Sequence, residues 1–173
     1  LDLQRLAARI SAYADARGWQ VERVGRAESG QLPVLTGGEF ERFWPISDPV
    51  ARAGARGGFF HPLTSYSLPD AVRFASWLAD VAPLDERLGE ATRARALRHW
   101  KRSAYDRLLA RMLFKAADPP LRYRILERFY RLPSALITRF YSGQSRTSDR
   151  IRILAGRPPV SIWRAMRVLK DRP

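Results

Sequence analysis

The segment from Gly57 to Ala71, GGFFHPLTSYSLPDA, constrains the fold of this chain more than any other. It combines two glycines, an uncharged polar loop and a helix-start signal. Ser67-Leu68-Pro69-Asp70 has the Ser-x-x-acid spacing of a helix N-terminus, and Pro69 falls in the first turn, where a missing N–H leaves no acceptor unpaired. We therefore expect a helix that starts at Ser67 and follows a tight loop.

The same segment suits a ligand-binding loop. Glycines permit positive φ and a close approach to the backbone, and the first-turn amides with the helix dipole favour a phosphate or an electron-rich ring edge. A plain loop-to-helix junction fits the composition equally well, because Ser-x-x-Asp caps also occur at helices that bind nothing.

Hydrophobic spacing predicts mostly helical structure. Residues 3–17 form a capped amphipathic pattern, residues 71–81 continue the helix that starts at Ser67, and 84–117 form a long pattern that Gly89 would bend or split. Pro and Gly punctuation predicts further helices at 120–130, 134–142, 147–155 and 161–170. Residues 19–24 and 32–36 have strand character and suggest a hairpin with a long loop.

Two aromatic groups are candidates for either core or binding surface. Phe43, Trp44, Phe59, Phe60 and Tyr66 would supply an apolar wall or simply pack inside. Arg-Phe-Tyr occurs at 128–130 and again at 139–141, which suits either an interface whose arginines reach phosphate or two ordinary amphipathic helices.

Charge is distributed unevenly along the 173 residues, whose net charge is +14. Residues 1–92 hold 10 basic and 12 acidic side chains, whereas residues 93–173 hold 21 and 5. The second half is therefore expected to face a polyanion, either an anionic bilayer surface or nucleic acid. No helix-turn-helix, basic zipper or RNA-binding motif is present, which weakens the nucleic-acid alternative.

Other classes of site and location are bounded by composition. The chain has no cysteine, so these residues hold no disulfide or thiolate metal site, and His61 and His99 alone cannot make a zinc site. We therefore expect no metal site. We also expect no spanning helix and a cytoplasmic location, because no long uncharged apolar stretch or signal-peptide pattern occurs. The start at Leu1 leads us to expect a piece of a longer chain.

Residues 61–69, HPLTSYSLP, resemble the HPTTGYSLP signature near the C-terminal end of bacterial lycopene β-cyclases. The resemblance continues, in order, through RAESGQLP at 26–33, RMLF at 111–114, RFYRLP at 128–133, LITRFYSG at 136–143 and the segment 150–160. It implies a C-terminal portion of such an enzyme, with the flavin-binding βαβ unit and the main catalytic acid expected upstream of Leu1.

The resemblance also implies site residues and cofactors. Binding to reduced FAD, with NAD(P)H as the reductant, is implied for Gly57, Gly58, His61, Pro62, Thr64, Ser65, Tyr66 and Ser67. Ser65 stands where the family usually has glycine, so a positive φ there would cost about 1 kcal/mol or more. Glu28, within RAESG, lies where the family also has an acidic residue. It is the candidate catalytic carboxylate of this segment, and a solvated loop glutamate is the alternative.

We therefore predict an α+β, mostly helical segment of a flavoprotein. Residues 1–50 would be a helix and β-hairpin of the substrate domain, residues 51–82 a return segment completing the FAD-binding domain, and residues 83–173 a basic helical region facing the membrane. The implied reaction is cyclisation of the ends of lycopene, at the inner face of the cell membrane. A basic binding module without catalysis and another FAD-dependent carotenoid-modifying oxidoreductase are the alternatives.

Overall fold

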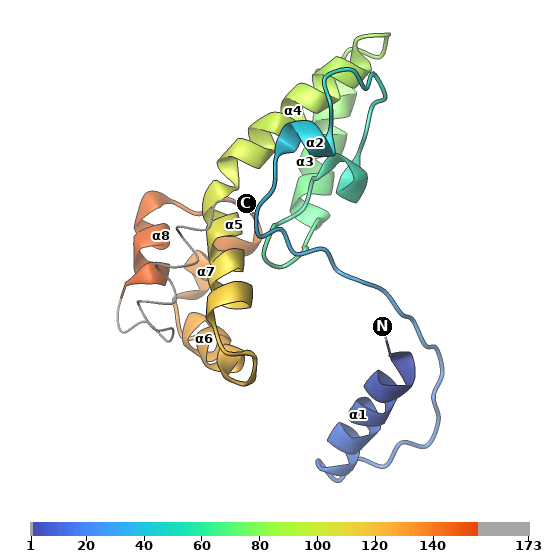
Figure 1. Cartoon of the computed structure of the whole chain (residues 1–173), viewed down its shortest axis with the longest axis vertical. Coiled ribbons are helices and arrows are strands. Elements are labelled where there is room, and N and C mark those ends of the chain that lie inside the picture. Colours follow the sequence, from blue (N-terminus) through green and yellow to red (C-terminus); the bar gives the residue numbers. More distant parts are fainter. Residues whose placement is uncertain (1, 156–173) are drawn as a thin grey trace. The chain divides into compact units, whose positions relative to one another are not determined.

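The computed structural model describes residues 2–155 of the chain (Figure 1). The contacts divide the chain into two units, Leu1–Leu32 and Pro33–Pro173. The predicted helix at 161–170 lies outside the described residues. The assignment of residues 1–50, 51–82 and 83–173 to domains of a flavoprotein stays a prediction, because packing within this chain does not reveal which domain a segment belongs to.

The first unit contains one helix, α1 (Leu3–Asp15), as the spacing predicts. The Asp2 side chain accepts a hydrogen bond from the Arg5 N–H at 2.9 Å, and Gly18 adopts φ +69° just beyond the helix end. Both ends therefore carry the caps expected from sequence. Trp19 folds back onto the helix and makes an edge contact with Tyr13, with ring centroids 5.9 Å apart.

The predicted β-hairpin is absent, since residues 2–155 contain no β-strand. Val21 and Val24 are exposed, so residues 19–24 bury no apolar face, whereas Val34 and Leu35 are half-buried. A two-stranded hairpin is marginal in water unless it packs on a sheet or a helix. Strand propensity at 19–24 therefore meets no surface on which to form, and the Leu35 N–H donates to the Pro62 carbonyl rather than to a partner strand.

The core of the second unit lies between α2 (Phe40–Phe43), α3 (Leu68–Asp80) and α4 (Leu88–Arg102). Its buried residues are Phe40, Trp44, Phe59, Phe74 and Ala96. Trp44 is fully buried and Phe59 contacts Phe74 at 4.9 Å between ring centroids, which assigns these two aromatic candidates to the core. Phe60 is buried as well, whereas Phe43 and Tyr66 are exposed.

The long pattern at 84–117 is interrupted at Ser103 rather than at Gly89. Helix α4 ends at Arg102, α5 spans Ala104–Arg111, and a π-helix follows at Met112–Ala116. Arg107 donates to the Trp100 carbonyl at 2.5 Å and to the Ser103 hydroxyl at 3.0 Å. These bonds satisfy polar groups released where the two helices meet.

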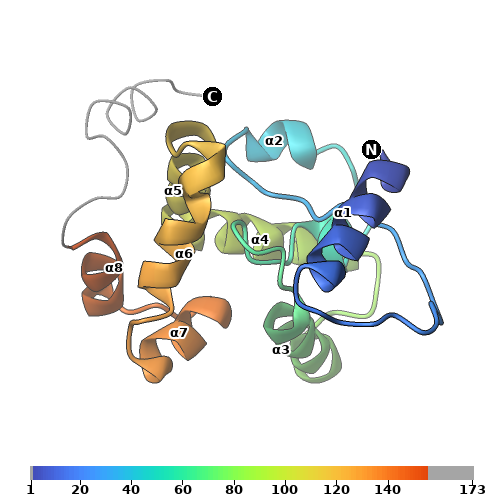
Figure 2. The ribbon, with the colours of Figure 1, turned by 90° about the horizontal axis from the view of Figure 1, so that it is seen from below.

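Three further helices confirm the predicted punctuation: α6 (Arg122–Phe129), α7 (Ser134–Tyr141) and α8 (Thr147–Leu154). Figures 1 and 2 show them gathered beside α5. Arg139 of α7 forms a bidentate ion pair with Asp149 of α8, in which Nη2 donates to Oδ1 at 2.6 Å and Nε donates to Oδ2 at 2.7 Å. Arg139 is therefore a structural ion-pair partner within the fold. None of the helices within residues 2–155 has the length and apolarity needed to cross a bilayer.

Gly89 has a packing role that differs from the predicted bend. A Cβ at this position would lie 1.7 Å from the Pro49 carbonyl oxygen, so only glycine lets the start of α4 approach that backbone. Gly30, in contrast, has no atom within 4 Å of such a Cβ.

We expect Gly89→Ala to destabilise the fold by about 3 kcal/mol, because backbone must move to relieve the overlap. Urea unfolding monitored by circular dichroism measures the loss. Gly30→Ala is the matched control and should leave the free energy of unfolding nearly unchanged. Equal stability of the two variants would show that the close approach to Pro49 is unimportant.

Candidate functional site

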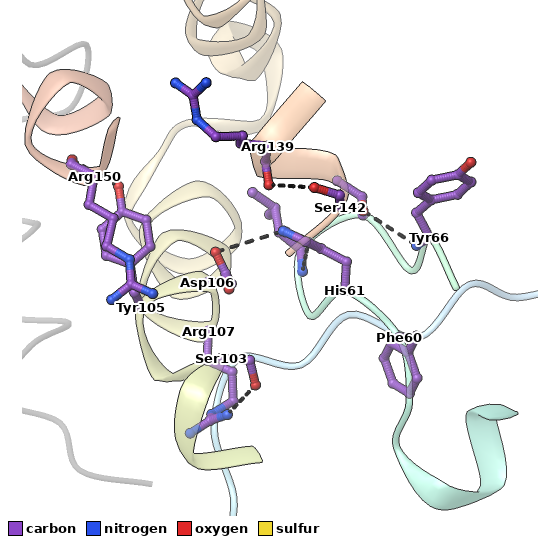
Figure 3. A network of polar contacts seen from close by, with 12 residues as sticks. Phe60, His61, Tyr66, Ser103, Tyr105, Asp106, Arg107, Arg139, Ser142 and Arg150 are labelled. Carbon is purple, nitrogen blue, oxygen red and sulfur yellow. Dashed lines mark hydrogen bonds and ion pairs between the residues drawn. The ribbon is translucent and has the colours of Figure 1, made fainter. Parts of the chain in front are cut away.

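Six of the predicted cofactor-binding residues belong to a closed turn, residues 61–67, which we call the histidine loop. Figure 3 shows His61 and Tyr66 of this loop. The His61 N–H donates to the Tyr66 carbonyl at 2.9 Å, and the Ser65 N–H donates to the His61 carbonyl at 2.9 Å. The Thr64 hydroxyl accepts from the Tyr66 N–H at 3.3 Å. The loop is therefore held by its own hydrogen bonds before it enters α3.

Ser65 adopts φ +61° and is the one non-glycine residue with positive φ among residues 2–155. The left-handed conformation expected from the glycine-to-serine difference is thus present. Its hydroxyl donates to the Pro33 carbonyl at 2.5 Å, and the Leu35 N–H donates to the Pro62 carbonyl at 2.9 Å. Residues 33–35 brace the loop from outside.

The two glycines before the loop are required by its geometry. A Cβ at Gly57 would lie 2.7 Å from the Phe59 ring and 3.0 Å from the Arg52 carbonyl oxygen, while Gly58 adopts φ +76°. The backbone is therefore closely packed at Gly57 and left-handed at Gly58, and each feature favours glycine.

Helix α3 begins as predicted, with Ser67 at its N-cap and Pro69 in the first turn. The Ser67 side chain makes no capping hydrogen bond, and Ser67 is exposed. The first-turn amides of α3 are therefore not occupied by this side chain and remain suited to an acceptor outside the chain.

His61 is the most buried polar residue of the loop, with 2% of its surface exposed. Its Nδ1 accepts from the Leu63 N–H at 3.3 Å, which assigns the ring proton of neutral His61 to Nε2. Nε2 faces Asp106 Oδ1 of α5 at 3.7 Å, and the imidazole contacts the Phe140 ring of α7 at 4.7 Å between centroids. One side chain thus joins the loop to two helices.

Burial shifts the pKa values of this pair in opposite directions. Burial lowers the pKa of His61 to about 4, with a smaller opposing contribution from the Asp70 charge. Burial raises the pKa of Asp106 to about 6, against the attraction of Arg150 and Arg107. Both shifts favour the neutral forms, as expected for groups removed from water.

A second histidine–aspartate pair lies beside the first. His99 Nδ1 is 3.6 Å from Asp70 Oδ1, which also accepts from Arg73 at 2.7 Å, and His99 Nε2 contacts the Phe60 carbonyl at 3.2 Å. The residues of both pairs line a small cleft together with Pro62, Arg73, Arg102, Ser103 and Gly143.

The two Arg-Phe-Tyr segments meet beside the loop. Phe129 of α6 contacts Phe140 of α7 at 4.8 Å, and Tyr141 makes an edge contact with Tyr66 at 6.3 Å. The Tyr130 and Tyr141 hydroxyls are hydrogen-bonded at 2.5 Å. The aromatic residues of the repeat therefore pack α6, α7 and the histidine loop together.

Glu28 belongs to the first unit, whereas the histidine loop belongs to the second. Its side chain is 70% exposed and pairs with Arg26 at 2.5 Å. A catalytic role for Glu28 stays a prediction. Sequence reasoning missed Asp106, because an acidic residue on a helical pattern gives no signal of its partner 45 positions earlier.

A family model described as "Lycopene cyclase protein" matches residues 1–167. The chain belongs to the lycopene cyclase family. No solved structure matches the chain.

Three relatives of the family carry the name lycopene beta-cyclase. The chain is 43% identical to that of Pseudescherichia vulneris over 160 residues, covering 90% of the chain and 42% of the relative. It is 41% identical to that of Paracoccus sp. over 177 residues, covering 100% and 45%, and 39% identical to that of Pantoea ananas over 170 residues, covering 98% and 44%. The chain thus spans less than half the length of these relatives, matching their C-terminal portion.

The opposite pKa shifts of His61 and Asp106 predict two contributions to the pH dependence of stability that cancel in the unmodified chain. Between pH about 4 and about 6, unfolding adds a proton to His61 and removes one from Asp106, so the two contributions cancel. In Asp106→Asn only the His61 contribution remains, so the free energy of unfolding should rise with pH by up to about 1.4 kcal/mol per pH unit relative to the unmodified chain.

His61→Gln leaves only the Asp106 contribution, and its stability should fall with pH over the same window. Urea unfolding at several pH values between about 4.5 and about 6.5 measures both slopes. Variants whose profiles run parallel to that of the unmodified chain would contradict the assignment of these two groups.

Proposed function

We propose that the protein containing this chain is a lycopene β-cyclase, which closes the ψ end groups of lycopene into β-ionone rings and yields β-carotene. The observation that carries the proposal is the identity of about 40% to three proteins named lycopene beta-cyclase, over nearly the whole chain. The reaction is an isomerisation, since a proton added to an end-group double bond is lost again after ring closure.

The second unit would complete the site for FAD, with Gly57, Gly58 and the histidine loop as the contacting residues. The fit rests on one feature of the chain. The first-turn amides of α3 are not capped by the Ser67 side chain, so they suit an acceptor such as a phosphate or an electron-rich ring edge. When bound, reduced FAD would supply an electron-rich ring that stabilises positive charge or donates a proton, with NAD(P)H as its reductant.

The chain's own residues would hold this surface in shape. The His61 ring, fixed between Leu63, Asp106 and Phe140, sets the conformation of the loop, and residues 33–35 brace it. Tyr66 is 42% exposed at the loop tip, where its ring could contact an apolar substrate and stabilise a developing cation. Trp44 and Phe59 support the loop from the core rather than from a substrate wall.

A carotenoid substrate dissolves in bilayers, so the enzyme would work at a membrane surface. We propose that the protein is cytoplasmic and lies on the inner face of the cell membrane, with the basic second half toward anionic lipid. The supporting feature is the charge distribution, 21 basic against 5 acidic side chains in residues 93–173.

Expression of the full-length protein in a lycopene-accumulating bacterial host tests the reaction. We expect β-carotene as the chromatographic product, and a selective loss of turnover, at least about a hundredfold, in Glu28→Gln if Glu28 relays a proton. Glu22→Gln, an exposed glutamate of the same unit, is the matched control. Products with altered unsaturation but no rings would instead favour an oxidoreductase. Equal turnover of the two variants would show that Glu28 is a solvated loop glutamate without a catalytic role.

Ser65→Gly should tighten flavin binding by about fivefold, because it removes a Cβ from the loop surface that the flavin ring would approach, and such a gain corresponds to about 1 kcal/mol. Fluorescence titration of the full-length apoprotein with FAD measures the dissociation constant. Ser65→Ala separates the two effects of the side chain, since it loses the hydrogen bond to Pro33 and keeps the Cβ. Equal affinity of the glycine variant and the unmodified protein would show that the Ser65 Cβ does not limit flavin binding.

A further inference from the structure

Arginines gather on one face of α4. Arg95, Arg98 and Arg102 are spaced by three and four residues, so they share a face of the helix. Arg95 Nη2 donates to the backbone carbonyl of Arg73 in α3 at 2.9 Å, and the Arg73 guanidinium is close enough for its charge to act on Arg95. α3 and α4 lie side by side in Figure 1. We call these four residues the arginine cluster.

Three arginines of the second unit each have their own carboxylate: Arg93 pairs with Glu41, Arg131 with Glu127 and Arg139 with Asp149. Within the cluster Arg73 pairs with Asp70 at 2.7 Å. No ion pair to Arg98 or Arg102 occurs within residues 2–155.

The charges of the cluster repel one another, and Arg95 experiences this repulsion. Burial lowers the pKa of Arg95, and the charges of Arg98, Arg102 and Arg73 lower it further, with only Asp70 opposing. Asp70 also contacts His99 of α4, at 3.6 Å between Oδ1 and Nδ1. At Arg95 the Asp70 charge opposes three neighbouring guanidinium groups, which leaves an excess positive charge that an anion would relieve.

One arginine of the cluster is held in place by contacts with α3, and two others are exposed to solvent. Arg95 is held by the Arg73 carbonyl and by the Trp77 ring, 4.9 Å from its guanidinium carbon. Arg98 and Arg102 are exposed on the same face. Planar guanidinium groups match phosphate oxygens with two parallel hydrogen bonds, so this arrangement suits a phosphate better than a single carboxylate.

We propose that the arginine cluster binds the headgroup phosphate of an anionic phospholipid and so fixes the part of the second unit that faces the membrane. The choice of a lipid phosphate rests on the proposed function, because a substrate dissolved in the bilayer requires the enzyme to sit on it. The cluster assigns that role to one face formed by α3 and α4, to which the basic half contributes Arg95, Arg98 and Arg102 and α3 contributes Arg73.

Flotation of the full-length protein with phosphatidylcholine vesicles, with and without phosphatidylglycerol, tests the proposal. Arg98→Gln/Arg102→Gln should lower partitioning onto the anionic vesicles about fivefold per arginine, on the order of 25-fold for both. Arg42→Gln/Arg56→Gln removes the same charge from two exposed arginines outside the cluster and should change partitioning little. Arg98→Lys/Arg102→Lys, which keeps the charge, should retain more binding than the glutamine pair.

Equal losses in the two glutamine double variants would overturn the proposal, because net charge alone would then explain binding. Displacement by inorganic pyrophosphate, beyond that by chloride at the same ionic strength and absent from the cluster variant, would also overturn it and assign the cluster to a soluble phosphate. Cyclisation measured separately in detergent micelles distinguishes the two proposals. An active enzyme without preference for phosphatidylglycerol contradicts the lipid site alone, and an inactive protein that binds these vesicles contradicts only the cyclase.

Discussion

The arrangement of the candidate site depends on one buried imidazole. His61 belongs to the loop, yet its ring faces Asp106 of α5 and packs on Phe140 of α7. Because Nδ1 is engaged by the Leu63 N–H, the only ring proton of the neutral form points toward Asp106. A charged imidazole would need more compensation than this pocket offers, so burial keeps the ring neutral and the loop in one conformation.

Local backbone conformation at the loop is maintained against its own preferences. Ser65 remains at φ +61° because its hydroxyl reaches Pro33 and its N–H reaches the His61 carbonyl, and these contacts offset the Cβ strain. Strain of this kind persists only where surrounding contacts determine the conformation. Its position beside an uncapped helix start is consistent with a loop shaped for a ligand rather than for stability alone.

Local sequence signals predicted much of this structure and failed where contacts are distant. The cap at Asp2, the helix start at Ser67 and the breaks before α6, α7 and α8 follow from neighbouring residues, which is why the sequence indicated them. Strand propensity at 19–24 failed because a strand needs a partner surface that propensity does not report. The pairing of His61 with Asp106 spans 45 positions, and no local pattern encodes it.

The same distinction explains the aromatic and arginine candidates. An Arg-Phe-Tyr repeat reads alike at 128–130 and 139–141, yet Phe140 is buried where Phe129 is half-buried, and Tyr130 is exposed where Tyr141 is half-buried. Composition alone therefore did not separate core from surface. For arginine the deciding quantity is the neighbouring carboxylate. Arg139 is neutralised by Asp149, whereas the α4 face keeps its excess charge, and that imbalance, rather than the total number of arginines, marks where an anion would bind.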